Sequence, residues 1–186
     1  MSDASEAIEF VRPRSAHNAP IYLADPDPGW ARDYQEQAAR VRAALPEGVV
    51  ALEHVGSTSV PGLTAKPVID MLLLVADPTD EASYVPALEA AGFLLYLREP
   101  GWHQHPLFRR ANPAANLHVF GSGSQEADRM LLFRDRLRSH PEERELYLGT
   151  KRELAARTWE RVQDYADAKA EVVEQIIARA REELGK

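Results

Sequence analysis

The sequence contains no cysteine, and this absence excludes disulfide bonds, thiolate zinc sites and cysteine nucleophiles. It also lacks the run of about 18 apolar residues that a membrane-spanning helix requires. Residues 1–20 carry acidic side chains and no apolar core, so they do not have the pattern of a secretory signal. We therefore expect a soluble cytoplasmic protein that has no membrane partner.

The chain also has fewer basic than acidic side chains. The chain has 22 lysines and arginines against 29 acidic residues, a net charge of -7, which argues against a general nucleic-acid-binding surface. A local basic groove remains compatible with this balance. At 186 residues and 45% apolar, the chain is long enough to bury a core. We expect a surface or mobile tail at 1–20 and a single domain at 21–186, of which 122–186 is a helical section. The oligomeric state is left open.

Hydrophobic periodicity predicts an α+β fold, in which a mixed sheet is flanked by helices. Asp27-Pro28 predicts the start of a helix that runs to the stop signal Pro46-Glu47-Gly48. Asn112-Pro113-Ala114-Ala115 has turn chemistry and predicts a hairpin. Ser139-x-x-Glu142 predicts a capping box at the start of a later helix. The remaining predictions are strands at 49–55, 68–75, 93–98, 107–110 and 116–120, a helix at 83–91, and C-terminal helices from about 130 with a break near 157–158.

A small polar turn within residues 54–75 has the chemistry of a phosphate site. Gly56 lets the backbone approach an anion closely, and Ser57, Thr58 and Ser59 add hydroxyl donors. Backbone amides at the start of a following helix would complete the cradle. The turn therefore predicts that these four residues bind the phosphates of a nucleotide.

Asp70 follows this turn within an apolar strand that we expect to be buried on both faces. A carboxylate in dry surroundings costs several kcal/mol unless it is paired or bound to a metal. Asp70 is thus the candidate Mg²⁺ ligand opposite the phosphate, because Mg²⁺ prefers carboxylate, phosphate and water oxygens. The structural alternative is a buried acid paired with Lys66 or a histidine. Glu53 and Glu99 are the candidate neighbouring carboxylates.

Two basic positions could join the phosphate site. Lys66 lies at the exit of the loop, where its ammonium either contacts a phosphate or is solvated. Arg109 and Arg110 are adjacent in a predicted strand, so their side chains point to opposite faces and at most one of them enters a site. The cationic residues on the predicted helices either line a substrate cleft or, as the default expectation, lie on a solvated surface; they are Arg134, Arg138, Lys151 and Lys169.

The histidines allow two interpretations. His103-x-His105 could place two imidazoles on one strand face and, with His118, form a zinc or iron site. Histidine pairs in a proline-rich loop are more often exposed. His54 and His118 are either polar lining near Asp70 or satisfied core histidines. Either of them could act as a catalytic base.

The sequence resembles the GrpB family over residues 20 to 180, approximately. The segments that carry the resemblance are His54 to Asp70, Asn116-Leu-His-Val, Leu132-Phe-Arg-Asp135 and Ala168-Lys169. By resemblance, GrpB proteins belong to the nucleotidyltransferase superfamily of the DNA polymerase β type, and related domains occur fused to dephospho-CoA kinases. The resemblance implies a nucleotidyltransferase-like mixed sheet with helices, a phosphate-binding turn at Gly56 and Ser57, and a metal-binding acid at Asp70.

This sequence departs from the pattern of active nucleotidyltransferases. Those enzymes carry a second carboxylate two residues after the first, on the same strand face, but here that position is Leu72. Their third carboxylate would fall on the strand at 116–120, which has none. Standard two-metal chemistry thus lacks its second and third acidic ligands.

Three functions remain open. The first is a nucleotidyltransferase-like protein that binds a nucleoside triphosphate with Mg²⁺ and transfers a nucleotidyl or phosphoryl group to a small acceptor, with Asp70 and His118 as candidate catalytic residues. The second is a degenerate nucleotide- or metabolite-binding protein without transferase activity, which Leu72 favours. The third is an interaction module in which the C-terminal helices bind a partner.

Overall fold

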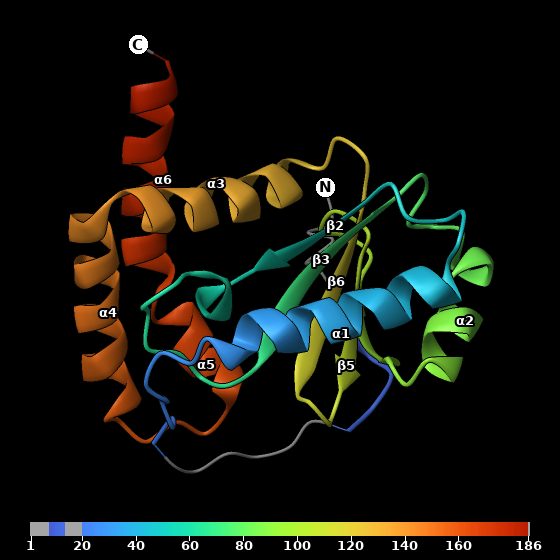
Figure 1. The fold of residues 1–186 in the computed structure, drawn as a ribbon, viewed down its shortest axis with the longest axis horizontal. Helices are drawn as coiled ribbons and strands as arrows, with labels where there is room; N and C mark the ends of the chain where they lie inside the picture. The colour runs from blue at the N-terminus through green and yellow to red at the C-terminus, as the bar shows by residue number, and fades with distance from the viewer. Residues whose placement is uncertain (1–7, 14–19, 186) are drawn as a thin grey trace, which may run out of the picture.

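A six-stranded mixed β-sheet forms the centre of the computed structural model, which describes residues 8–13 and 20–185 (Figure 1). The strands are β1 (Glu9–Phe10), β2 (Ala51–Val55), β3 (Ile69–Val75), β4 (Leu94–Glu99), β5 (His105–Arg110) and β6 (Ala115–Gly121). The helices are α1 (Gly29–Ala44), η1 (Ser57–Ser59), η2 (Glu81–Ser83), α2 (Val85–Ala90), α3 (Gln125–Ser139), α4 (Pro141–Ala155), α5 (Val162–Asp167) and α6 (Ala170–Leu184). The predicted α+β class, with a mixed sheet flanked by helices and a C-terminal helical section, is confirmed.

The sheet has the strand order β1-β4-β5-β6-β3-β2. β3 runs parallel to β6, whereas the other neighbouring strands are antiparallel. The parallel register places Asp70 opposite Asn116 and Leu72 opposite His118. The predicted hairpin is β5 and β6, and β4 contains a register shift between Leu95 and Leu97.

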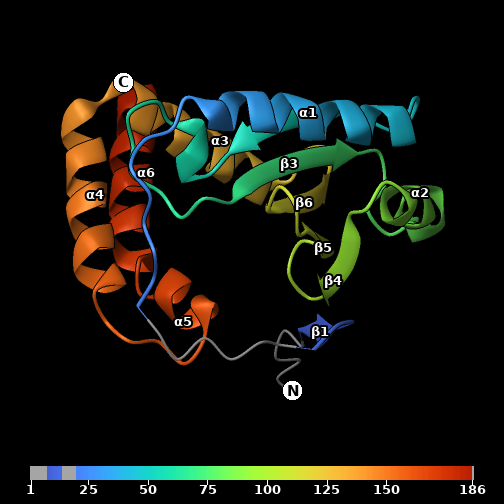
Figure 2. The ribbon, with the colours of Figure 1, turned by 60° about the horizontal axis from the view of Figure 1, so that its bottom comes forward.

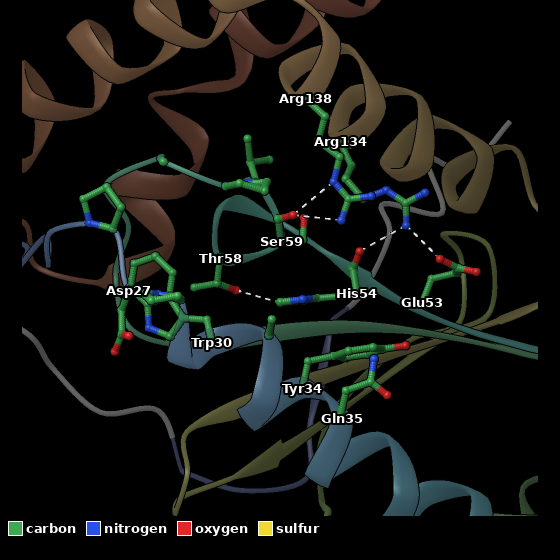
Figure 3. A pocket seen from close by; sticks show the side chains of 16 residues that line it. Asp27, Trp30, Tyr34, Gln35, Glu53, His54, Thr58, Ser59, Arg134 and Arg138 are labelled. Carbon is green, nitrogen blue, oxygen red and sulfur yellow. Dashed lines mark hydrogen bonds and ion pairs between the residues drawn. The ribbon is translucent and has the colours of Figure 1, made fainter.

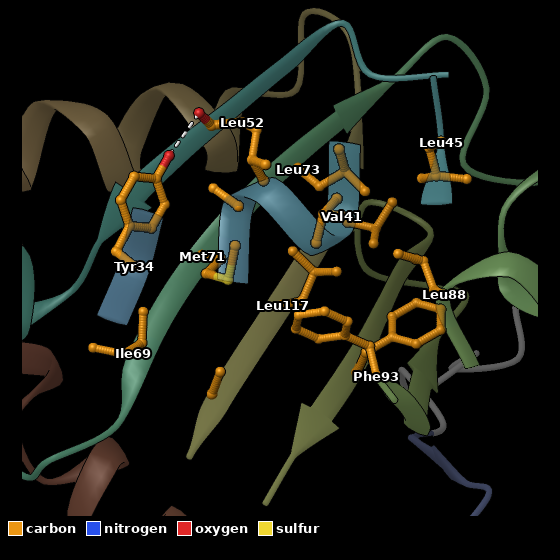
Figure 4. Packing of buried hydrophobic residues seen from close by; sticks show 14 of the residues in the cluster. Tyr34, Val41, Leu45, Leu52, Ile69, Met71, Leu73, Leu88, Phe93 and Leu117 are labelled. Atoms are coloured by element: carbon orange, nitrogen blue, oxygen red, sulfur yellow. Dashed lines mark hydrogen bonds between the residues drawn. The ribbon is translucent and has the colours of Figure 1, made fainter. Parts of the chain in front are cut away.

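The two faces of β3 pack against different helices, because successive side chains of a strand point to opposite sides. Met71 and Leu73 lie in the main core with Val41 of α1 (Figure 4). Leu72 lies in a smaller cluster on the other face, with Phe120 and other apolar residues near α3. The expectation of a strand buried on both faces holds for these apolar residues. The site described below lies on the second face.

Two helix starts differ from the sequence predictions. α1 begins at Gly29, one residue later than predicted, although the Asp27 carboxylate does accept a hydrogen bond from the Gly29 amide (2.7 Å). The predicted capping box at Ser139 is wrong. The residue that precedes α4 is His140, and the Ser139 hydroxyl donates back to the Asp135 carbonyl (2.8 Å) because Ser139 still belongs to α3.

Helices α3, α4 and α6 pack together beside the sheet (Figure 1). Glu143 of α4 is buried between them and accepts two hydrogen bonds from Arg179 of α6 (2.6 and 2.7 Å) and one from Arg136 of α3 (3.2 Å). The predicted break near 157–158 is confirmed, since α4 ends at Ala155 and α5 begins at Val162.

Part of the expected tail joins the sheet. Glu9 and Phe10 form β1 and pair with Arg98 and Leu97 of β4, while residues 1–7 and 14–19 lie outside the described part of the chain. Within residues 8–13 and 20–185, no helix has the length and apolar character needed to cross a bilayer.

Candidate functional site

A cavity of about 640 Å³ opens on the face of the sheet opposite α1. Figure 2 shows α1 on one side of the sheet and α5 on the other. Residues of β1, β4, β5, β6 and β3 form one wall, and the C-terminal helices form the opposite wall. The lining residues that matter below are Gly56, Ser57, Lys66, Asp70, Glu99, Arg109, Asn116, His118, Lys151 and Lys169.

The polar turn and Asp70 are in direct contact. Gly56 has a φ of 68°, and a Cβ at this position would lie 2.5 Å from Oδ2 of Asp70. The Ser59 hydroxyl is used within the turn, because it donates to the Gly56 carbonyl (2.6 Å). Thr58 likewise donates to the Val68 carbonyl (3.2 Å). Ser57 is the residue of this turn whose hydroxyl is left for a ligand in the cavity.

Asp70 finds its partners on the neighbouring strand. The Asn116 amide donates to Oδ1 (2.8 Å), and Nε2 of His118 lies 4.0 Å from the same oxygen. Burial raises the pKa of Asp70, but His118, Asn116 and the charge of Lys169 together hold it below its ordinary value. The side chain is 30% exposed, so the carboxylate faces the cavity rather than the dry core. Asn116 and His118 account for the partly buried Asp70 carboxylate without a metal or Lys66.

Cationic side chains surround this carboxylate. Lys66 extends from the loop before β3, and its pKa is lowered by burial and by the charges of Arg109 and Lys169. The Arg109 guanidinium lies 3.5 Å above the ring centre of Tyr96. Arg110, as predicted, points to the other face, where it donates to the Ala91 carbonyl (3.0 Å). The cavity is thus a local basic site in an acidic protein.

Two further cations of the cavity, Lys151 and Lys169, were expected from the sequence to be solvated rather than to line a cleft. Lys151 of α4 is 2% exposed, and its ammonium donates to the Thr64 carbonyl (2.6 Å). Burial, reinforced by Lys169, lowers the pKa of Lys151 to about 7. Lys169, just before α6, lies 4.3 Å from the ring centre of Tyr165. A lysine in an amphipathic helix looks like a surface residue in sequence, so no periodicity signal marks Lys151.

A row of hydrogen bonds crosses the sheet beside Asp70. Glu99 Oε2 lies 2.6 Å from Nδ1 of His105, and Nε2 of His105 lies 3.1 Å from Nδ1 of His118. His103 does not join this row. It lies in the turn before β5 with a φ of 53°, so His103 and His105 do not share a strand face.

The interpretation of the histidines as a zinc or iron site is not supported. No group of three or more histidine, aspartate or glutamate side chains gathers as a metal site among residues 8–13 and 20–185. His105 instead has a carboxylate and an imidazole as its hydrogen-bond partners.

A second cavity of about 530 Å³ lies on the other side of η1 (Figure 3). Trp30 and Tyr34 of α1 form its aromatic wall, and Thr58 belongs to the lining of both cavities. His54 stacks on Tyr34 (4.6 Å), and Nε2 of His54 lies 3.1 Å from the Thr58 hydroxyl. Burial lowers the pKa of His54 to about 4. His54 is therefore a neutral, structurally satisfied residue outside the Asp70 cavity.

Ser59 and Glu53 also belong to this second cavity. The Ser59 carbonyl accepts two hydrogen bonds from Arg138 (2.8 and 3.0 Å). Glu53 accepts from Arg134 (2.8 Å), so it does not supply a second acid beside Asp70. Of the predicted site residues, the Asp70 cavity brings together Gly56, Ser57, Thr58, Lys66, Asp70, Arg109 and His118, and does not include Ser59.

Comparison with known proteins agrees with this fold. A UPF0157 protein of Halalkalibacterium halodurans is 49% identical over 88% of this chain and 84% of its own length. A dephospho-CoA kinase of Mycolicibacterium paratuberculosis is 29% identical over 77% of this chain, a match that spans 42% of that protein. The crystal structure of the conserved protein GrpB from Enterococcus faecalis covers 89% of this chain with a TM-score of 0.74 and 26% identity. The family model described as GrpB protein matches residues 20–179, and the chain belongs to the GrpB family.

Proposed function

We propose that the Asp70 cavity binds the phosphates of a nucleoside triphosphate. The observation that supports this most strongly is the gathering of Lys66, Arg109, Lys151 and Lys169 around one cavity in a chain whose net charge is -7. Such a concentration of positive charge is costly unless an anion is there to balance it. The lowered pKa of Lys66 reflects this mutual repulsion together with burial. A triphosphate supplies compensating negative charge in one ligand.

The individual side chains suit this ligand. Arg109 carries a planar guanidinium that can hold two phosphate oxygens, while Lys66 and Lys169 act as point charges. The Ser57 hydroxyl adds a neutral donor beside Gly56. Asp70 would repel a bare phosphate, so its carboxylate calls for a bound cation or a protonated group between the two.

Magnesium would fit beside Asp70 as an ion that is also bound to the triphosphate. Among residues 8–13 and 20–185, no three histidine, aspartate or glutamate side chains gather as a metal site. Mg²⁺ is commonly held by one or two carboxylates together with phosphate oxygens and water. Asp70 would be the carboxylate that receives Mg²⁺ bound to the triphosphate. The ion would neutralise phosphate charge.

We further propose group transfer of the nucleotidyltransferase type, in which a nucleotidyl or phosphoryl group passes to a small acceptor. His118 is the side chain in position to accept the acceptor's proton, since its Nε2 lies on the Asp70 side of the ring. The cations around the cavity would stabilise negative charge on the phosphate as the transfer proceeds.

A second function, binding without transfer, is favoured by Leu72. It shares a strand face with Asp70 and is fully buried in an apolar cluster, so no second acid is available there. The residue opposite it on β6 is His118 rather than a carboxylate. On this alternative the chain would be a sensor of a nucleotide or a related metabolite.

Calorimetric titration with each nucleoside triphosphate, with and without Mg²⁺, tests the binding proposal. We expect binding to depend on Mg²⁺ and to be lost in Asp70→Asn and weakened in Ser57→Ala. Absence of binding to every triphosphate at millimolar concentration would contradict the proposal. Release of pyrophosphate or phosphate in the presence of a panel of small acceptors, lost in Asp70→Asn, would separate transfer from binding alone.

A further inference from the structure

A row of polar side chains beside the cavity spans four adjacent strands, and hydrogen bonds join its first three members. Glu99 belongs to β4, His105 to β5, His118 to β6 and Asp70 to β3. The successive separations are 2.6 Å from Glu99 to His105, 3.1 Å from His105 to His118 and 4.0 Å from His118 to Asp70. Each imidazole therefore has both of its nitrogens directed at a neighbour in the row.

The chemistry of Glu99 fixes the direction of the first hydrogen bond. An ionised carboxylate can accept but not donate, so Nδ1 of His105 carries the proton. In a neutral His105 the other nitrogen, Nε2, then has a lone pair. That lone pair can only accept, and Nδ1 of His118 must be its donor. In a neutral His118, Nε2 is then left without a proton, whereas the imidazolium carries protons on both nitrogens and faces the Asp70 carboxylate.

The surroundings of His105 favour its neutral form. Its side chain is 4% exposed and stacks on Phe120 with a ring separation of 4.5 Å. The Trp102 ring meets it edge on at 5.4 Å, and the parallel His118 ring lies at 5.2 Å. Burial, which outweighs the effect of Glu99, lowers the pKa of His105.

We infer that Glu99 and His105 are positioning residues that hold His118 in the tautomer with its proton on Nδ1. The unprotonated Nε2 then faces the Asp70 side of the cavity, ready to accept a proton from an acceptor hydroxyl or amine. The carboxylate of Asp70 at 4.0 Å stabilises the imidazolium that forms. This use of His118 rests on the proposed function, whereas the tautomer itself does not.

The same reasoning separates His118 from His54, the other candidate base. The Thr58 hydroxyl donates to the Val68 carbonyl, so it accepts the proton on Nε2 of His54. His54 also lines the second cavity, away from the Asp70 carboxylate. His118 is therefore the histidine whose free nitrogen the fold presents to the proposed phosphate site.

Nitrogen-15 NMR of histidine-labelled protein without ligand tests the inference, because long-range proton–nitrogen correlations distinguish the two neutral tautomers. In the wild type we expect His118 to carry its proton on Nδ1. Glu99→Ala removes the acceptor and should give mixed tautomers at His118, whereas Glu99→Gln keeps an accepting oxygen and should retain the wild-type pattern. Glu36→Gln, an exposed change on α1, is the control.

Two results would overturn the inference. One is a wild-type His118 that carries its proton on Nε2, a measurement that needs no variant to fold. The other is a His118 tautomer that does not change in a folded Glu99→Ala protein.

Failure of the proposed function can be told apart from failure of this inference. In the first case the wild type would show the expected His118 tautomer but would bind no triphosphate. Where turnover is found, Glu99→Ala should lower kcat by about tenfold or more with unchanged triphosphate affinity, and Glu99→Gln should restore most of it. A loss of affinity with unchanged kcat would contradict a positioning role.

Discussion

Gly56 and Asp70 fit together as one unit, in which the absence of a side chain on the glycine makes room for the carboxylate. A Cβ on residue 56 would lie 2.5 Å from Oδ2 and 2.9 Å from Cβ of Asp70. The glycine φ of 68° is also a conformation that other residues rarely adopt. The position of the acid relative to the polar turn is thus set by this contact.

Replacement of the glycine tests that relationship. Gly56→Ala combines an unfavourable backbone conformation, worth about 1–3 kcal/mol, with a clash that displaces the Asp70 carboxylate. We expect lower stability in urea denaturation and weaker triphosphate binding. Gly123→Ala is the matched control, because Gly123 has a φ of 81° but nothing within 4 Å of the added Cβ. If both variants bind equally well, the contact does not position the acid.

The buried Lys151 predicts an unusual dependence of stability on pH. Its pKa of about 7 in the folded protein lies below the ordinary value of 10.5, so between these values the unfolded chain binds more protons. The free energy of unfolding should therefore rise with pH in this window, by at most about 1.4 kcal/mol per pH unit. Lys151→Met should lack this contribution in urea titrations from pH 6 to 10. The exposed neighbour substitution Arg152→Met should keep it.

Asp70 predicts the opposite trend in acid. Its pKa is lowered on folding, so the ionised form stabilises the fold above the unfolded value of about 3.9, and this contribution is lost as pH falls through the folded pKa. The stability difference between wild type and Asp70→Asn should therefore shrink as pH falls below about 4. Thermal denaturation across the acid range measures it, with Glu36→Gln as an exposed control. A constant difference at every pH would argue against a lowered pKa.

The two adjacent arginines of β5 offer a matched pair for the binding proposal. Arg109→Met removes a cation from the cavity and should weaken triphosphate binding about tenfold or more, since charged hydrogen bonds contribute about 1.5–3 kcal/mol. Arg110 also belongs to the cavity lining, but its guanidinium donates to the Ala91 carbonyl on the other sheet face, so Arg110→Met should weaken binding much less. Calorimetric titration with the triphosphate, at low and at moderate salt, compares the affinities of the two variants. Equal losses would indicate a general charge effect.

The junction of α3, α4 and α6 makes a prediction about stability alone. Glu143, which is 5% exposed, is hydrogen-bonded to Arg136 and Arg179. Glu143→Ala should destabilise the fold by about 1.5–3 kcal/mol, because Arg179 loses its hydrogen bonds to this carboxylate and Arg136 is left with Glu183 as its carboxylate partner. Glu142→Ala, an exposed change at the preceding residue, should cost much less. Chemical denaturation of the two variants provides the comparison.

Sequence patterns were sufficient for most of the strands and helices and for the local part of the candidate site, but not for β1 or for the start of α4. The β-branched and apolar run around Asp70 predicts a buried strand, and the two-residue period correctly places Leu72 on the same face. Gly56 and Ser57 lie close enough in sequence to Asp70 for one loop to bring them together. These inferences depend on short separations along the chain, where backbone geometry leaves few alternatives.

The rest of the site depends on contacts that no local pattern encodes. Lys151 enters the cavity because α4 packs against the segment between η1 and β3, where the ammonium donates to the Thr64 carbonyl, and its helical spacing resembles that of a solvated lysine. Glu99 and His105 join His118 through the pairing of β4, β5 and β6. Of the two interpretations of His54, the satisfied core histidine is correct and the polar lining near Asp70 is wrong. His54 and Val55 are neighbours in β2, and strand alternation sends the His54 ring to the α1 side.

The parallel pairing of β3 with β6 has a consequence for how the protein acquires its site. Asp70 and its partner Asn116 are separated by 46 positions in the chain, and β4 and β5 lie between them in sequence. Closing such a loop has an entropic cost that must be met before the contact forms, so non-local pairings of this kind tend to slow folding. The polar turn therefore does not form the site without the rest of the sheet. A nascent chain that has emerged only as far as β3 holds the turn and the acid, but not the strand that orients them.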